Sequence, residues 1–432
     1  MTKILHRTRT RRTLALAIVG VLLGAAACTE LTALKQENPG QLSADPLFVP
    51  ANAQLLVNGA IGDFECAFSR YAVGSGALMD ELSVAISSSI NFDYDRRTLP
   101  TNAGYGTNSC DNSLQGPGVY TPLSTARASA DTIAAKLEGW TDAQVANRTK
   151  LIGQAYAYAG YSLVLLGEGM CSAAINLSPE MTPAQLFAEA KSRFDKAIAS
   201  STTANDVATI KLATMGRART LQDLGSLSAA AADAAKITDN TYVANISTDA
   251  TNARRQNAVY VTTVLNYFYT VDVSFRGLTF GGVADPRVSV VNSGKTGTAG
   301  GAVWQASKGL LATSPMAITR WSEAQLIQAE NFVATGNLSA AVDIINALHT
   351  KAGLPAYDGT GQTATQVLAQ VIEERRREFF LEGHRLGDIR RFGLALNPVA
   401  GTTFPYGGQY GTQSCFPLPD VERANNPNIT RP

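Results

Sequence analysis

The chain has 432 residues, of which 45% are apolar and 16% charged, with 36 basic residues against 35 acidic ones. This apolar fraction in a chain of this length can bury a large core, which excludes a disordered chain and a small disulfide-stapled scaffold. The balance of charge also argues against a basic nucleic-acid-binding protein, because such a protein needs an excess of Lys and Arg.

The first residues have the pattern of a secretion signal. The basic residues come first and are Lys3, Arg7, Arg9, Arg11 and Arg12. An apolar run over residues 14–27 follows, too short to span a bilayer comfortably, and it ends in three alanines directly before Cys28. A lipoprotein signal peptidase accepts small residues before a cysteine. We therefore expect a signal peptide over residues 1–27, a lipid on Cys28 and a polar tether over residues 28–50; an ordinary cleavage site is the alternative.

Loss of the five basic residues of the leader would leave 31 basic against 35 acidic residues, so the mature chain is mildly acidic. Four cysteines remain in it: Cys66, Cys110, Cys171 and Cys415. They show no CxxC pair and no Cys/His cluster with zinc spacing, so we expect no metal site. An even number in an exported protein indicates disulfides. Of the three pairings we favour Cys66 with Cys110 and Cys171 with Cys415.

Helical signals dominate the body of the chain. Residues 143–170 carry apolar residues at helical spacing, and Thr182-Pro183 is an N-cap followed by proline at the first helical position. That cap predicts a helix to about residue 200. Two more helices are expected over about 204–224 and 227–237.

An internal sequence repeat indicates repeated helical hairpins. Residues 218–225, followed by Ser226-Leu227-Ser228-Ala229-Ala230, match residues 329–336, followed by Asn337-Leu338-Ser339-Ala340-Ala341, at an offset of 111 residues. Each copy is typical of a helix, a tight glycine turn and a second antiparallel helix. Leu166-Gly167 is expected to close a helix in the same way. Such hairpins stack into tetratricopeptide-like arrays; chance endings of alanine-rich helices at glycine are the alternative.

Two stretches differ in amino-acid composition from the expected helices. Residues 84–122 and 240–317 are rich in Gly, Asn and Thr and contain short β-branched runs, which predicts loops and short strands. No interdomain linker is evident, so residues 51–432 are expected to form one α-rich domain carrying these two insertions. Long irregular insertions in a helical scaffold often carry function.

The C-terminal third contains an ordered series of motifs, with Asp80-Glu81 and Asp285-Pro286-Arg287 upstream of it. The series is Ile318-Thr319-Arg320-Trp321-Ser322-Glu323-Ala324, Ile372-Glu373-Glu374-Arg375-Arg376-Arg377-Glu378-Phe379, Glu382-Gly383-His384-Arg385, Asp388-Ile389-Arg390-Arg391, Phe416-Pro417-Leu418-Pro419 and Asn426-Pro427-Asn428-Ile429. It closely resembles the SusD/RagB family of outer-membrane nutrient-binding lipoproteins. The resemblance is strong over residues 318–432 and loose over the remainder.

The resemblance implies an α-dominated fold with tetratricopeptide-like hairpins, long loop insertions and few short strands. It also implies a lipid-anchored protein, exposed on the cell surface at the outer membrane, that caps a TonB-dependent (SusC-like) transporter. Its ligand would be an oligosaccharide first and a peptide second. No cofactor and no nucleic-acid partner are implied.

Binding a glycan calls for aromatic rings on loops, because sugar rings present flat C–H faces that stack on them while polar groups take the hydroxyls. In the resembling family the ligand aromatics come from two loop regions. The candidate ligand-binding residues in the two irregular stretches are Asp93, Tyr94, Arg96, Tyr105, Tyr267, Tyr269 and Trp304. Packing of each ring on the scaffold is the alternative.

No catalytic motif is present, so the chain is not expected to be an enzyme. The charges over residues 373–382 are interpreted as an ion-pair network, with Glu373 and Glu374 pairing with Arg377 along one helix face. His349 and His384 are poor candidates for catalysis or metal binding. A helical scaffold for a protein partner and a secreted hydrolase are the competing functions.

Overall fold

The computed structural model describes residues 47–110 and 116–430, so the leader, Cys28 and most of the tether lie outside the described residues. Contacts divide the chain into Met1–Val49 and Pro50–Pro432, and the helices and strands described here belong to the second unit.

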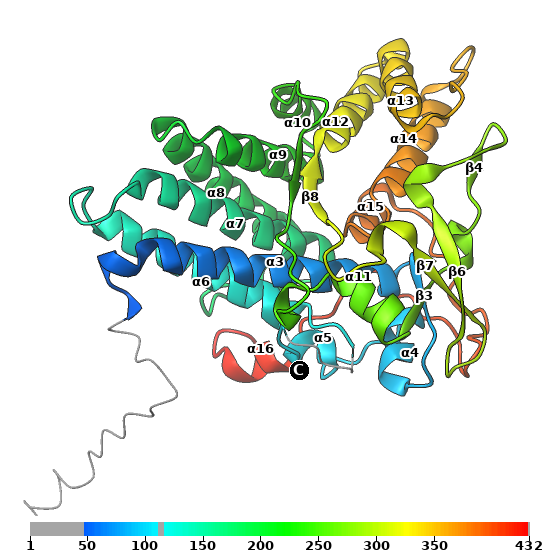
Figure 1. Ribbon diagram of the computed structural model, residues 1–432, viewed down its shortest axis with the longest axis horizontal. Coiled ribbons are helices and arrows are strands. Elements are labelled where there is room, and N and C mark those ends of the chain that lie inside the picture. Colours follow the sequence, from blue (N-terminus) through cyan, green and yellow to red (C-terminus); the bar gives the residue numbers. More distant parts are fainter. Residues whose placement is uncertain (1–46, 111–115, 431–432) are drawn as a thin grey trace, which may run out of the picture. The chain divides into compact units, whose positions relative to one another are not determined.

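Helices make up most of that unit, which confirms the expected α-dominated fold (Figure 1). The α-helices of the described residues are α3 (Ala53–Leu78), α4 (Ser89–Asp95), α5 (Gly104–Thr107), α6 (Tyr120–Gly139), α7 (Arg148–Gly169), α8 (Pro183–Thr203), α9 (Val207–Asp223), α10 (Leu227–Ala234), α11 (Ala258–Tyr260), α12 (Trp321–Ala334), α13 (Leu338–Ala352), α14 (Ala364–Glu378), α15 (Arg385–Phe392) and α16 (Asp420–Asn425).

The strands are short and pair in twos, in line with the few short strands expected. They are β1 (Leu82–Val84), β2 (Val243–Asn245), β3 (Tyr269–Val271), β4 (Thr279–Phe280), β5 (Val283–Ala284), β6 (Val290–Thr296), β7 (Ala302–Ala306) and β8 (Ala317–Arg320). All four pairings are antiparallel: β1 with β3, β2 with β8, β4 with β5 and β6 with β7. Most of these strands lie in the irregular stretch over residues 240–317.

The long helices pack on their neighbours in chain order. Helix α3 lies against α6 and α7, then α7 packs on α8 and α8 on α9, and the five run side by side in Figure 1. The second group continues from α10 through α12 to α13 and α14. Helix α8 begins where the sequence predicts it, because Thr182 and Gln185 form a capping box and Pro183 stands at the first helical position.

The internal sequence repeat corresponds to two equivalent helical hairpins. Helix α9 turns into α10 at Gly225 and α12 turns into α13 at Gly336, and both glycines have a left-handed backbone, with φ of 73° and 80°. In each turn the next residue donates its N–H back into the helix, Ser226 to the Leu221 carbonyl and Asn337 to the Phe332 carbonyl, at 2.8 Å each. The expectation of a helix, a glycine turn and a second helix is confirmed.

Gly167 does not end a helix, which corrects the expectation for Leu166-Gly167. Helix α7 continues to Gly169, and Gly167 belongs to a row of glycines at a spacing of seven residues that faces α8. A Cβ added at Gly153, Gly160 or Gly167 would lie 2.2–2.7 Å from Ser201, Phe194 or Phe187 of α8. These glycines therefore let the two helices approach closely.

Two disulfides fix the loops around α3 and α7. The structure joins Cys66 to Cys110 and Cys171 to Cys415, which is the pairing favoured above. The second spans 244 residues and ties the segment after α7 to the C-terminal segment. Closing a loop of this length stabilises a fold by roughly 5–6 kcal/mol in the chain-entropy model.

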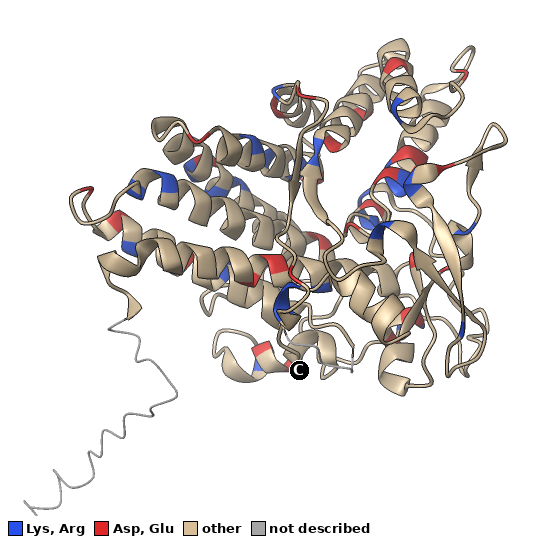
Figure 2. Cartoon of the chain, in the orientation of Figure 1, with Lys and Arg blue, Asp and Glu red and all other residues tan. Residues whose placement is uncertain are grey.

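A buried ionic network joins the motif series to the helical core, and Figure 2 shows acidic and basic residues side by side on α14 and around α15. Glu373 pairs with Arg377 at 2.7 Å, as expected, whereas Glu374 pairs instead with Arg287 at 2.6 Å and with His349 at 2.8 Å. The pairing of Glu374 with Arg377 is wrong because Glu374 faces the β-rich insertion and α13.

At the end of α3 the network holds the turn between α14 and α15. Asp80 accepts two hydrogen bonds from Arg385, at 2.7 Å each, and Glu81 accepts the backbone N–H of Leu381 at 2.8 Å. Burial raises the pKa of Glu81 to about 7, helped by the negative charge of Asp80. Glu81 is thus neutral in the folded protein at acidic and nearly neutral pH.

The glycine row generates the first prediction. Gly160→Ala places a methyl group 2.7 Å from the Phe194 ring and should lower the free energy of unfolding by about 1–3 kcal/mol, measured by urea denaturation. Gly59→Ala on α3 is the matched control, because nothing lies within 4 Å of its added Cβ. There the loss of glycine's freedom should stabilise the protein by up to about 1 kcal/mol. Equal effects at both positions would contradict the packing role.

The raised pKa of Glu81 generates the second prediction. An unfolded glutamate loses its proton near 4.5 while folded Glu81 keeps it to about 7, so this group makes stability fall as pH rises between those values. The full effect is roughly 3 kcal/mol. Glu81→Gln should remove this fall. The difference in free energy of unfolding between the variant and the wild type should therefore shift in favour of the variant when the pH is raised from 5 to 8. Glu180→Gln, at an exposed glutamate, should follow the wild-type pH profile.

Candidate ligand-binding surface

Three of the tyrosines proposed from the sequence are part of the scaffold. Tyr94, Tyr105 and Tyr269 are at most 1% exposed. Their hydroxyls donate to the Pro117 carbonyl at 2.8 Å, to the Pro417 carbonyl at 2.9 Å and to the Asn91 side-chain oxygen at 3.1 Å, respectively. A buried ring has no free face for a sugar, so these three do not form a stacking surface and the expectation for them is corrected.

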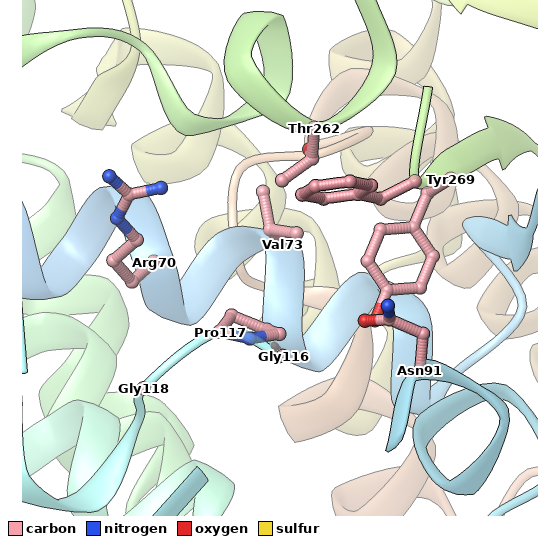
Figure 3. A pocket seen from close by; sticks show the side chains of 9 residues that line it. Arg70, Val73, Asn91, Gly116, Pro117, Gly118, Thr262 and Tyr269 are labelled. Carbon is pink, nitrogen blue, oxygen red and sulfur yellow. The ribbon is translucent and has the colours of Figure 1, made fainter. Parts of the chain in front are cut away.

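Tyr269 instead lines a small internal cavity, seen in Figure 3 with Arg70 and Val73 of α3, Asn91 of α4 and Thr262 around it. Its volume is about 10 Å³, the space of a single water molecule. The Asn91 side-chain nitrogen is buried there without a hydrogen-bond partner among the described residues. The cavity can satisfy that group through one water but cannot admit a sugar ring.

Asp93 and Arg96 lie on the surface at the end of α4. Their side chains form an ion pair at 2.7 Å and remain about a quarter exposed. The Arg96 guanidinium also donates to the Gly407 carbonyl at 3.2 Å and lies 5.7 Å from the centre of the Phe404 ring. This pair therefore connects α4 to the C-terminal segment over residues 401–411.

That segment brings to α4 a group of aromatic rings that the candidates chosen from the sequence did not include. Tyr406 stacks on Phe92 with ring centres 5.0 Å apart and an angle of 7°, and Phe404 meets both rings edge-on. Tyr406 is 36% exposed, whereas Phe404 is buried beneath it. Phe92, Arg96, Phe404, Tyr406 and Tyr410 are called the α4 aromatic surface below.

The backbone of the segment explains how these rings meet. Residues 401–410 form a narrow hairpin in which Thr403 bridges to Gln409, and the turn uses Gly407 and Gly408 at φ of 104° and 81°. Gly411 then donates its N–H to the Arg96 carbonyl at 2.7 Å, which fastens the hairpin to the end of α4. The sequence signal for this unit is the pair Gly407-Gly408 between aromatic residues at 404, 406 and 410.

Burial shifts the pKa values of two charged groups that lie beneath the α4 aromatic surface. Burial raises the pKa of Asp95 to about 7, and the negative charge of Asp272 adds to the shift. Its carboxyl accepts the backbone N–H of Val84 at 2.7 Å, so α4 is held against β1. Burial also lowers the pKa of Arg97, whose guanidinium lies 5.0 Å from the centre of the Tyr410 ring.

Trp304 and Tyr267 keep partial exposure in the β-rich insertion. Trp304 lies on β7, its indole 5.3 Å from the Arg276 guanidinium, and its backbone N–H donates to Thr270 of β3 at 2.8 Å. Tyr267 follows a π-helical turn over Val261–Leu265 and has a left-handed backbone, with φ of 52°. Both stay candidates for ligand contact, and β3 places Trp304 in the same β1–β3 region against which α4 packs.

The described residues contain no group of three or more His, Cys, Asp or Glu side chains that could hold a metal ion. Within the same residues, no helix combines the length and apolar character that crossing a bilayer requires. His384 is buried and accepts a hydrogen bond from Arg219 at 3.2 Å; burial, aided by that positive charge, lowers its pKa far below its usual range. It is a structural histidine.

Fold and surface together define an α-helical hairpin protein with an exposed aromatic surface on its loops. The SusD family model matches residues 289–414. This match agrees with the family resemblance that the motif series indicates. No curated protein is similar enough in sequence to match.

Solved structures share the fold at low sequence identity. A SusD superfamily protein from Bacteroides vulgatus is 18% identical with a TM-score of 0.64, covering 87% of this chain and 97% of its own. A SusD-like carbohydrate binding protein from the same organism is 16% identical with a TM-score of 0.63, covering 88% and 97%. A SusD superfamily protein from Bacteroides fragilis is 13% identical with a TM-score of 0.68, covering 89% and 99%.

The buried hydroxyls generate a prediction that separates scaffold from ligand contact. Tyr94→Phe leaves the Pro117 carbonyl without its donor and should lower the free energy of unfolding by about 1 kcal/mol. Tyr406→Phe, at an exposed ring, should change it by less than about 0.5 kcal/mol. Thermal unfolding measures both. A stable Tyr94→Phe protein with weakened glycan binding would restore Tyr94 as a ligand residue.

Proposed function

We propose that this protein captures oligomeric nutrients at the cell surface, glycans foremost, and delivers them to a partner TonB-dependent transporter. The observation that carries the proposal is the exposed, stacked pair of Tyr406 and Phe92 beside the Arg96–Asp93 ion pair. It offers an aromatic face for the C–H side of a sugar ring and charged groups for the hydroxyls around it.

The mode of binding follows from the support beneath the rings. Phe404 and the Gly411–Arg96 hydrogen bond fix Tyr406 and Phe92 before a ligand arrives, so little side-chain freedom is lost on binding. Trp304 lies on β7 with its indole beside the Arg276 guanidinium, and we propose it as a second contact for a longer oligomer. The fold neighbour described as a SusD-like carbohydrate binding protein supports glycan over peptide.

Location and partner rest on the sequence and the family. The basic and apolar leader before Cys28 supports export and lipid anchoring at the outer membrane, with the protein exposed to the outside. A surface-held binding protein that does no chemistry needs a channel to take its ligand inward, and the family resemblance names a SusC-like transporter. We assign no catalytic step to the protein.

The test is binding of a panel of soluble oligosaccharides by isothermal titration calorimetry. Tyr406→Ala removes the exposed ring and should weaken binding of the best oligosaccharide by about threefold to tenfold, the worth of one stacking contact. Tyr406→Phe should bind like the wild type. Trp140→Ala is the matched control, because this aromatic residue lies at the end of α6, and it should also leave oligosaccharide affinity unchanged.

Two outcomes would refute the proposal. Binding of short peptides with no oligosaccharide bound would assign peptide capture instead. Unchanged oligosaccharide affinity in Tyr406→Ala would move the site away from the α4 aromatic surface.

A further inference from the structure

A second cavity, separate from the α4 aromatic surface, lies among the helices that carry the family motifs. Its volume is about 210 Å³, far more than a water molecule occupies and suited to a molecule of roughly monosaccharide size. Its walls come from the end of α7, the start of α8, the end of α9 and the helix α15. It is called the α8–α15 cavity below.

One wall presents a cation without a counter-ion. Arg390 donates from Nη1 to the carbonyls of Gly167, Glu168 and Met170, at 3.1, 2.6 and 2.9 Å. No carboxylate of the described residues lies within ion-pair distance of it, and its Nε and Nη2 atoms make no hydrogen bond there. Arg390 is half-buried, and burial lowers its pKa against the attraction of the nearby Tyr71, Glu168 and Asp223.

The neighbouring arginine is in the opposite situation. Arg391 reaches Glu330 and also binds Asp388 at 3.3 Å, so its charge is already balanced by the protein. Glu168 is likewise occupied, because both of its oxygens accept from Arg219 at 2.6 Å. Among the charged residues of the cavity wall, Arg390 is therefore the group left with unused donors.

Asp223 provides a second unused group. Its side chain is 8% exposed, its Oδ2 atom has no hydrogen-bond partner in the described part of the chain, and its nearest cation, Arg391, is 3.9 Å away. Burial raises the pKa of Asp223 well above its ordinary value, and the negative charge of the adjacent Glu168 raises it further. The positive charges of Arg391 and Arg219 oppose this rise.

The rest of the wall suits the flat body of a small molecule. Pro183 and Phe187 of α8 line it, together with Gly167 and Gly387. Pro183 is also the first residue of a 21-residue helix, so the positive end of the α8 dipole is directed to this region. Hydrogen-bond donors and an apolar surface thus lie side by side in one pocket.

We propose that the α8–α15 cavity is a binding site for a small organic carboxylate. The carboxylate accepts hydrogen bonds from the free N–H groups of Arg390, while the body of the ligand packs on Phe187 and Pro183. A sugar acid and an aromatic acid share this chemistry. The site does not depend on the glycan-binding proposal.

The experiment is calorimetric titration of the purified protein with D-glucuronate, benzoate, D-glucose and sodium sulfate at constant ionic strength. At least one of the two carboxylates should bind at least tenfold more tightly than D-glucose and sulfate, and should raise the unfolding temperature. Preference for D-glucuronate assigns a sugar acid, and preference for benzoate assigns an aromatic acid. Equal binding of D-glucose, equal binding of sulfate or no binding of either carboxylate would overturn the site.

Arg390→Lys tests the assigned residue while sparing the fold. A lysine ammonium has three donors for the three carbonyls that Arg390 now holds, but it lacks the planar edge that faces the cavity. Carboxylate affinity should fall at least tenfold with an unchanged circular dichroism spectrum and unfolding midpoint. Asp223→Asn keeps the size of the side chain and should bind within about threefold of the wild type.

Arg96→Gln on the α4 aromatic surface is the matched control. It should leave carboxylate affinity unchanged while weakening glycan binding, and Arg390→Lys should do the reverse. Equal carboxylate affinity in Arg390→Lys and the wild type would overturn the assignment of Arg390. Because the two variants report on different surfaces, failure of one proposal is distinguishable from failure of the other.

Discussion

The pairing of Asp80 with Arg385 is the interaction on which the rest of the structure depends. These residues are separated by 305 positions, yet the two side chains meet through two hydrogen bonds of 2.7 Å and are almost fully buried. Removing one partner would leave an unpaired buried charge, which costs several kcal/mol. The ion pair therefore holds the end of α3 against the turn before α15. Glu81 stabilises the same contact by accepting a hydrogen bond from the Leu381 N–H.

This junction places the two regions to which we assign binding. From the end of α3 the chain runs through β1 into α4, which carries Phe92 and Arg96. From the α14–α15 turn it runs into α15, which carries Arg390, and then to the hairpin that carries Tyr406. The Cys171–Cys415 disulfide holds the far end of that hairpin segment to the end of α7. The loops to which we assign ligand binding are thus anchored at both ends on a packed helical core, which keeps their side chains in place.

The two regions differ in the chemistry they offer. The α4 aromatic surface is open, and its charged groups are paired with each other, so it suits an extended ligand held by stacking and hydroxyl contacts. The α8–α15 cavity is partly open to solvent and holds a guanidinium without a direct ion-pair partner, so it suits a small anion. Burial decides the difference, because a charge in water needs no partner whereas a charge removed from water does.

Much of the fold could be predicted from the sequence, because its signals are local. The Thr182–Gln185 cap, the glycines at 225 and 336 and the Glu373–Arg377 pair all act within one or two helical turns. The same reasoning failed at Gly167, whose role is contact with α8, and at Glu374, whose partners lie on other elements. It also failed for the tyrosines, since residue type marks Tyr94, Tyr105 and Tyr269 as suitable for stacking but says nothing about their burial.

The sequence by itself determined the helical hairpins, the family motifs and the charge of the chain, because each follows from composition, periodicity or short spacing. Only the tertiary structure decided which aromatic rings face outward and which arginine lacks a counter-ion. Tyr406 meets Phe92, and Arg390 shares a cavity with Asp223, through contacts between segments far apart in the chain. Burial and the satisfaction of a charge are properties of such contacts, and no local pattern in the sequence encodes them.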